Sequence, residues 1–336
     1  MSNKKSQHYV PQFYLRKFSS DSPKVINLYN IDSEHFIKNA TIKHQACKDY
    51  FYNTDVNIEN AFAYFEEGIS HIINKILNDL KLPKENSDEY ILLLFFISIQ
   101  INRTQYAHDE ILEAHSKILN SIGKNLKRKI NFSNDDWNWI FKRLEIVFKA
   151  TPYLQDLKMK LILNKTTIPF IFSDNPIVLY NQFLELKGYV ELGFASVGIE
   201  FFIPLSPRAY LILYDSKIYD VGKCYSNIIN ITNNTDIYQL NKLQFLSSNN
   251  NLYFNNDCDQ KYITNLILKN KQYRRTHKIN IKKFYSLHGD CDMLFRLQNE
   301  PIICDLKLSF IRFTKKSKNY KYETNKTIHT RYNYRL

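Results

Sequence analysis

Two glutamates with helical spacing and a distant arginine form the first group of residues that could do chemistry. Glu59 and Glu66 are seven residues apart in a segment with helical periodicity, so both lie on its apolar face. A carboxylate there needs a partner, and the natural one is Arg103, which with Gln100 ends the apolar run. Two interpretations stay open. Glu66 and Arg103 form a buried ion pair that sets the helix register, or Glu66 is a general base or metal ligand and Arg103 binds an anion.

Two stretches match the spacing of a metal-dependent nuclease. Asp174 is followed by Glu185-Leu186-Lys187, and Asp292 is followed by Asp305-Leu306-Lys307. In such sites carboxylates hold Mg²⁺ and a lysine positions the attacking water. Because the pattern occurs twice in a lysine-rich chain, the alternative is solvated charge at strand edges. The sequence leaves the cofactor open; if a metal is used, we expect Mg²⁺ at Glu66 and Asp174.

Several common signatures are absent from the sequence. It has no P-loop, no G-x-G-x-x-G, no H-E-x-x-H and no G-x-S-x-G, which excludes the usual nucleotide-binding, zinc-protease and α/β-hydrolase motifs. The five cysteines are scattered without a C-x-x-C pair, which favours a reducing compartment and no zinc framework. The N-terminal residues do not form a secretory signal, and the longest apolar run is too short to span a bilayer. We therefore expect a cytoplasmic protein with no membrane partner.

Positive charge is concentrated near the C-terminus. Residues 269–336 hold 17 of the 46 basic residues but only 5 of the 33 acidic ones. This asymmetry indicates an anionic partner, or a basic face that docks elsewhere on the protein. Basic residues interleaved with tyrosines suit single-stranded nucleic acid, and the alternative is a disordered basic tail. The candidate nucleic-acid-binding residues are Arg312, Lys315, Lys316, Lys318, Tyr320, Lys321 and Tyr322.

The elements that must position these residues change in type along the chain. Residues 57–79 and 88–129 have helical spacing, and a further helix follows Ser133. Ser87, before Asp88 and Glu89, is the expected N-cap of the second helix. Strands are predicted around Leu161 and Phe170 and over 200–204, 210–214 and 302–313, and helices over 223–247 and 258–273. This order predicts an α+β fold, with an N-terminal helical half packed on a mixed or antiparallel β-sheet, further helices and a basic C-terminal extension. We predict one composite domain over 1–275 and the tyrosine-rich extension over 276–336.

Five short motifs occur in order along the first two thirds of the chain. They are His8 to Phe18 (HYVPQFYLRKF), Ile58-Glu59 with Glu66, Gln100-x-x-Arg103-Thr104, Phe172 to Pro176 (FSDNP) and Pro204 to Pro207 (PLSP). With these motifs the chain resembles a bacterial family known as domain of unknown function 4238, over about residues 6–255. The residues at the family's motif positions are His8, Gln12, Glu59, Glu66, Arg103, Asp174 and Asn175. The resemblance implies no established reaction; members are associated with defence against phages, which implies an effector or toxin.

Three functional hypotheses follow, and the sequence leaves open whether the protein is an enzyme. In the first, it is a nuclease in which His8, Glu66 and Asp174 are acid/base groups or metal ligands and Arg103 stabilises phosphate charge. The supporting residues of this site are Gln12, Glu59, Gln100 and Asn175. The second is a non-catalytic sensor that binds nucleic acid or a partner, and the third is a nucleotide or small-molecule hydrolase. The first hypothesis requires its four main residues to meet in one solvent-reachable pocket between helices and strands.

Overall fold

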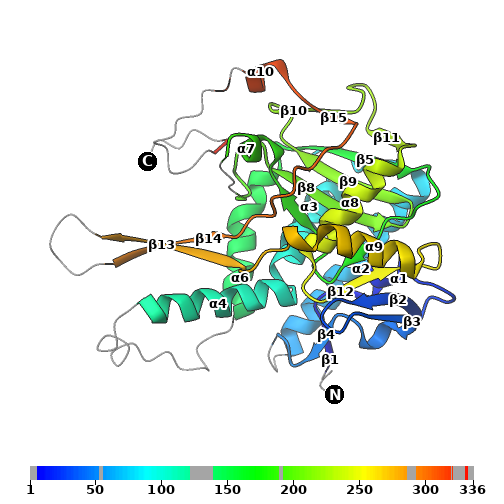
Figure 1. Cartoon of the computed structure of the whole chain (residues 1–336), viewed down its shortest axis with the longest axis horizontal. Helices are drawn as coiled ribbons and strands as arrows, with labels where there is room; N and C mark the ends of the chain where they lie inside the picture. The colour runs from blue at the N-terminus through cyan, green and yellow to red at the C-terminus, as the bar shows by residue number, and fades with distance from the viewer. Residues whose placement is uncertain are drawn as a thin grey trace.

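The protein has an α+β fold in which helices cluster beside two main β-sheets (Figure 1). The structure is a computed structural model that describes residues 6–52, 56–121, 139–188, 192–285, 293–318, 320 and 330–331. Most strand pairs are antiparallel, as the sequence predicts. Within the described residues, no helix is long and apolar enough to cross a membrane.

The larger sheet has five strands in the order β11-β5-β9-β8-β7. Its strands are β5 (Lys158–Asn164), β7 (Val178–Tyr180), β8 (Glu200–Ser206), β9 (Ala209–Tyr214) and β11 (Ile228–Ile231). Only the β11–β5 pair is parallel. Every residue of β9 is buried, because both faces of this central strand are covered, and its sequence is accordingly apolar almost throughout.

A second sheet carries four strands in the order β3-β2-β12-β6. They are β2 (Val25–Asn30), β3 (His35–Thr41), β6 (Phe172–Ser173) and β12 (Asn251–Phe254). Helix α8 (Asn234–Ser247) packs against β6 of this sheet and β7 of the other, and α9 (Gln260–Asn270) packs on α8. Because α8 is buried nearly all round, its polar side chains are hydrogen-bonded: Gln244 accepts from the backbone N–H of Ser173 (3.1 Å). This helix therefore ties the two sheets together.

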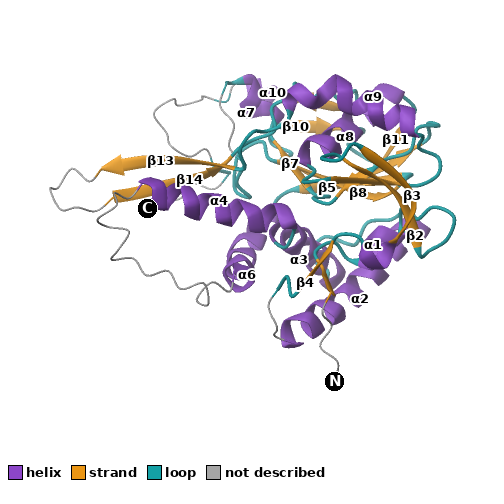
Figure 2. Cartoon of the chain, turned by 60° about the horizontal axis from the view of Figure 1, so that its bottom comes forward, coloured by secondary structure: helices purple, strands orange, loops and turns teal. Residues whose placement is uncertain are grey.

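Among the described residues, the helical half has four main helices on one side of the sheets (Figure 2). They are α2 (Val56–Asp79), α3 (Asp88–Asn102), α4 (Gln105–Ser121) and α6 (Trp139–Ala150). The hydroxyl of Ser87 caps α3 by accepting from the backbone N–H of Tyr90 (3.3 Å), as its position before two acidic residues predicts. Helix α3 is apolar on most sides and packs against both α2 and α6.

The predicted continuous helix over residues 88–129 is wrong, because the chain breaks at Arg103 and Thr104. Arg103 leaves the helical conformation (φ −109°, ψ 4°), and its carbonyl accepts a hydrogen bond from the Tyr52 hydroxyl (3.3 Å). The Thr104 hydroxyl then caps α4 by accepting from the backbone N–H of Ala107 (3.2 Å). The last part of the predicted helix, 122–129, lies outside the described residues, as does Ser133.

The N-terminal segment forms a small unit against the helices. Strand β1 (Ser6–His8) pairs with β4 (Cys47–Asp49), and α1 (Gln12–Arg16) follows immediately after Pro11. The buried ring of Tyr14 on α1 lies against Phe96 of α3 and Phe172 of β6. These aromatic contacts fix the segment between the helical half and the second sheet, which positions His8 near α2.

The described residues after 275 pack against the rest of the protein. The hairpin of β13 (Ile279–Tyr285) and β14 (Met293–Asn299) runs beside α4, and β15 (Ile311–Phe313) pairs with β10 (Tyr219–Val221). Short helix α10 (Lys315–Lys318) follows β15. Of the residues predicted as strand over 302–313, only Ile311–Phe313 is one, and the predicted helix over 223–247 contains β11 before α8 begins.

We predict that Thr104→Ala destabilises the protein by about 1–2 kcal/mol, because the substitution removes the N-cap of α4. It also removes the bond that the Thr104 hydroxyl donates to Asn175 Oδ1 (3.3 Å). Urea unfolding followed by circular dichroism measures the difference. The matched control is Thr104→Ser, which keeps the hydroxyl; an equal loss in both variants would contradict the capping role.

Candidate functional site

A cavity of about 830 Å³ lies between the N-terminal segment and helix α2, and we call it the His8 pocket. Its wall on one side comes from β1 and α1, with His8 and Gln12, and on the other from α2, with Glu59 and Glu66. The remaining lining residues are Ser6, Gln7, Phe13, Arg16, Lys43, Tyr52, Phe62, Ala63, Glu67, Ser70, His71 and Asn74. Four of the residues singled out in the sequence thus line one solvent-reachable pocket, although they come from two separate segments.

His8 has one ring nitrogen without a partner in the described part of the chain, and burial favours the neutral form of its imidazole. Burial lowers the pKa of His8, an effect that backbone hydrogen bonds from the ring to Ile42 and Lys43 partly offset. Nε2 is buried and has no hydrogen-bond partner among the described residues. We therefore assign the backbone contacts to Nδ1. In the neutral ring Nδ1 then carries the proton, and the free lone pair is on Nε2.

Glu66 is oriented from behind by Arg103. The guanidinium Nη2 donates to Glu66 Oε1 at 2.9 Å, and Arg103 is only 1% exposed. Its Nε donates to Gln100 Oε1 (3.0 Å), and its Cζ lies 5.0 Å from the centre of the Phe62 ring. The Glu66 side chain is 24% exposed and lines the pocket, so the oxygen that Arg103 does not bind can meet a ligand. The structure thus contains the Glu66–Arg103 pair that the sequence predicts.

Gln100 and Tyr52 connect this ion pair to the N-terminal segment. Gln100 Nε2 donates to the carbonyl of Tyr9 (2.9 Å), directly after His8. The Tyr52 hydroxyl lies within hydrogen-bond distance of the His8 carbonyl (3.1 Å) and the Arg103 carbonyl (3.3 Å). Sequence reasoning missed Tyr52, because one tyrosine in a tyrosine-rich chain carries no signal of its own. His8, Glu66 and Arg103 are therefore positioned by one buried hydrogen-bond network.

The pocket combines a proton acceptor with a carboxylate and has cations at its edge. The unpaired Nε2 of His8 can accept a proton, and Glu66 can orient a water or a hydroxyl by accepting a hydrogen bond. Arg16 and Lys43 are exposed lining residues, and Arg16 donates to Gln12 Oε1 (2.9 Å). Such a set is suited to proton transfer beside a bound anion. Sequence reasoning did not single out Arg16 or Lys43, since their charge gains meaning only next to His8.

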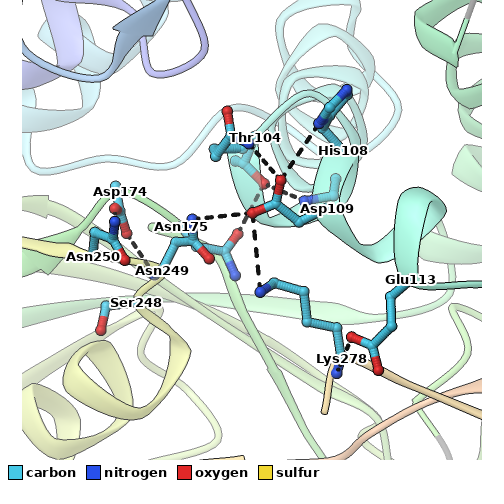
Figure 3. A network of polar contacts seen from close by, with 12 residues as sticks. Thr104, His108, Asp109, Glu113, Asp174, Asn175, Ser248, Asn249, Asn250 and Lys278 are labelled. Atoms are coloured by element: carbon cyan, nitrogen blue, oxygen red, sulfur yellow. Dashed lines mark hydrogen bonds and ion pairs between the residues drawn. The ribbon is translucent and has the colours of Figure 1, made fainter. Parts of the chain in front are cut away.

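Asp174 does not line the His8 pocket; it belongs to a network of polar contacts that joins α4 to the turn between α8 and β12 (Figure 3). Its carboxylate accepts three backbone N–H bonds, from Asn249 (2.7 Å), Asn250 (2.8 Å) and Asn251 (2.9 Å). The residue is 1% exposed, and burial raises the pKa of Asp174 to about 6. These contacts make Asp174 an acceptor that closes the turn before β12.

The neighbours of Asp174 in Figure 3 have structural partners as well. Asn175 accepts from Thr104 and donates to the Ser247 carbonyl (3.1 Å). Asp109 on α4 accepts from Asn249 (3.3 Å) and lies 4.0 Å from the Lys278 ammonium. Because Glu66 and Asp174 lie in different places, they share no metal site. No group of three or more His, Cys, Asp and Glu side chains in the described part of the chain could hold a metal ion.

The candidate nucleic-acid-binding residues lie on another part of the surface. Arg312 in β15 is exposed, as are Lys315, Lys316 and Lys318 on α10. The Tyr320 ring packs edge-on against Phe183 at 5.4 Å, and Lys321 and Tyr322 lie outside the described residues. Both views place α10 on the opposite side of the molecule from β1 and α2 (Figures 1 and 2). These cations therefore do not border the His8 pocket.

The motifs that build the pocket and the Asp174 network all fall within one family model. The model described as Protein of unknown function (DUF4238) matches residues 6–258. The chain belongs to this family. No curated protein and no solved structure matches it. The DUF4238 match ends before the basic segment, so the family region of this protein holds the His8 pocket but not α10.

We predict that Asp174→Ala destabilises this DUF4238 protein by on the order of 3 kcal/mol, because it leaves three buried backbone N–H groups without an acceptor. Thermal and urea unfolding measure the loss. The comparison variant is Glu89→Gln, which removes one charge of the exposed pair with Lys75 (2.8 Å) and is expected to cost less than about 1 kcal/mol. A fully stable Asp174→Ala protein would contradict the structural role.

Proposed function

We propose that the His8 pocket is the active site of a nuclease that hydrolyses phosphodiester bonds, and that the protein acts as an effector in defence against phages. The observation that carries the proposal is the unpartnered Nε2 of a neutral His8, in the same pocket as a carboxylate that Arg103 holds in one orientation. The defence role rests on the resemblance of the sequence motifs to the family.

In the proposed reaction, His8 moves one proton and Glu66 positions the nucleophile. Nε2 of His8 is buried in this structure, so a rotation of the ring must first bring it to the pocket. It then accepts a proton from a water molecule whose other hydrogen is held by Glu66. The water oxygen forms the new bond to phosphorus, and the bond from phosphorus to the leaving oxygen breaks. The imidazolium returns its proton to that leaving oxygen, so the histidine ends neutral. Arg16 and Lys43 bind the phosphate oxygens at the pocket edge.

Arg103 acts through Glu66 in this proposal. It is buried, its Nε and Nη2 are bound to Gln100 and Glu66, and it does not line the pocket. We therefore assign it as a positioning residue, in place of the direct phosphate contact that the sequence suggested. The four-residue site that the sequence hypothesis required is not formed, because the Asp174 carboxylate is occupied by backbone N–H groups outside the pocket. The proposal therefore rests on His8 and Glu66 and gives Asp174 no part in the chemistry.

We predict that His8→Ala and Glu66→Gln each lower phosphodiester hydrolysis at least 100-fold, the range for loss of a general acid–base group. The assay measures cleavage of labelled DNA and RNA by the purified protein, with circular dichroism as the check on folding. His35→Ala and Glu89→Gln are matched controls, because both residues are outside the pocket, and Glu89 pairs with Lys75. Full activity in a folded His8→Ala, Glu66→Gln double variant would end the proposal.

We predict that activity falls on the acid side with a midpoint below pH 6.5. His8 must be neutral to accept the proton, and its pKa lies below the ordinary value of 6.5 because the ring is buried. Below that pKa the ring is protonated and the base is lost, whereas at neutral pH it is fully available. The pH dependence of kcat/KM measures the midpoint. A profile that is flat from pH 5 to 8 would rule out His8 as the base.

The third hypothesis, a nucleotide or small-molecule hydrolase, is favoured by one observation. The cavity volume of about 830 Å³ falls within the usual range for small-molecule pockets, roughly 300–1,000 Å³. The same residues would do the same chemistry on a free nucleotide. Nucleotide profiles of cells after induction distinguish the two: falling nucleotide pools with intact nucleic acid would replace the nuclease by this alternative.

A further inference from the structure

A second cavity, of about 380 Å³, lies between helices α4 and α6, strand β7 and residues 192–195. It shares no lining residue with the His8 pocket. We call it the Glu110 pocket, after the buried acid that lines it. It is bounded by the helix that starts at the α3–α4 break, and Asn102, directly before Arg103, is one of its lining residues.

The pocket contains a buried ion pair with two polar atoms left over. Arg143 Nη2 binds Glu110 Oε2 at 2.6 Å, and Arg143 Nη1 donates to Asn102 Oδ1 at 3.3 Å. Glu110 Oε1 and Arg143 Nε are buried and have no hydrogen-bond partner among the described residues. Glu110 is only 4% exposed. The two partners of this charged contact thus carry one unpaired acceptor and one unpaired donor.

Such leftover atoms need an explanation, because buried polar groups without partners cost free energy and are rare in folded proteins. Burial also raises the pKa of Glu110, which the Arg143 charge opposes. Both features are common where a ligand completes the hydrogen bonding of a site. The Tyr106 hydroxyl, which lines the same pocket, is likewise buried without a partner in the described structure.

The remaining wall of the pocket is partly apolar, with side chains of Ile101, Ile146, Ile177 and Phe194. Polar residues line it too, among them Asn175, Ser247 and Asn299, and the Arg275 guanidinium lies over the Tyr106 ring, 4.6 Å from its centre. A flat, largely apolar ligand with a polar edge would fit this arrangement. The polar edge of the ligand must carry a hydrogen-bond donor for Glu110 Oε1 and, next to it, an acceptor for Arg143 Nε.

The wall of residues 192–195 is held in place by Arg331, near the C-terminus. The Arg331 backbone N–H donates to the Ala195 carbonyl (2.7 Å), and its Nη1 donates to the Ser196 carbonyl (2.9 Å). Its Nε binds Asp156 at 3.0 Å. The pocket is therefore assembled from segments between Ile101 and Arg331, and its shape is specified by contacts across the whole chain.

We propose that the Glu110 pocket binds a nucleobase, as a nucleoside or nucleotide. The Watson–Crick edges of purines and pyrimidines carry a hydrogen-bond donor next to an acceptor, which matches the unpaired Glu110 Oε1 and Arg143 Nε. The apolar wall accepts the flat ring, and 380 Å³ is sufficient for one base with part of its sugar. This inference is independent of the chemistry proposed for the His8 pocket.

The test is calorimetric titration of the full-length protein with adenosine, guanosine, cytidine and uridine, one at a time. We expect saturable binding of at least one nucleoside. Glu110→Gln should weaken it at least tenfold, because the amide can keep its oxygen on Arg143 and then presents N–H where the ligand donates. Ile146→Trp should abolish it by filling the cavity from a half-exposed position that tolerates a larger side chain.

The controls separate this site from the His8 pocket and from general damage. Phe141→Trp lies on the same helix outside the cavity and should leave binding unchanged, as should His8→Ala. If Glu110→Gln does not fold, Ile146→Trp decides alone. The proposal is overturned if no nucleoside binds at millimolar concentration, or if binding is unaffected by Ile146→Trp. Loss of binding in His8→Ala would place the nucleoside in the other pocket and overturn it too.

Discussion

The buried contact between Arg103 and Glu66 connects the end of one helix to the middle of another, and much of the helical half is arranged around it. A guanidinium that is 1% exposed needs its partners inside the protein, and Arg103 has them for Nε and Nη2, whereas Nη1 has none among the described residues. Glu66 supplies the opposite charge and Gln100 a further acceptor, and Phe62 covers the guanidinium plane. Because these partners come from α2 and α3, the two helices can pack in only one register. Removing the Glu66 charge would leave the Arg103 charge buried without compensation.

The same constraint explains why the chain turns between α3 and α4. Three consecutive residues at the break serve different neighbours: Asn102 accepts from Arg143, Arg103 binds Glu66, and Thr104 caps α4 and contacts Asn175. The His8 pocket lies on the Arg103 side and the Glu110 pocket includes Asn102. One short irregular segment therefore contributes to both cavities and to the Asp174 network. A continuous helix would also point these three side chains in different directions, about 100° apart per residue. In such a helix, however, the Arg103 carbonyl would accept a helix hydrogen bond and could not accept from the Tyr52 hydroxyl.

Comparison of particular elements shows where sequence reasoning succeeded. The α+β class, the Ser87 cap and the pairing of Glu66 with Arg103 follow from periodicity, from capping chemistry and from the need to neutralise a carboxylate on an apolar face. The break at Arg103 was missed because neither Arg103 nor Thr104 disfavours a helix strongly, and no glycine or proline marks the place. The tertiary contacts of both residues set the position of the break. The Glu110–Arg143 pair was missed for a similar reason: its members lie on separate helices in a chain with many charges.

The amino-acid sequence alone determined which segments are helices or strands in outline and which polar residues need partners, because periodicity and burial act locally. It also determined that His8, Gln12, Glu59 and Glu66 share motifs with one family. Beyond the Glu66–Arg103 pair, only the tertiary structure decided which polar residues meet. His8 lies near α2 because β1 pairs with β4. Asp174, directly after β6, instead accepts hydrogen bonds from the backbone of the turn before β12. Contacts between residues tens of positions apart depend on how the sheets and helices pack, and local spacing carries no information about that.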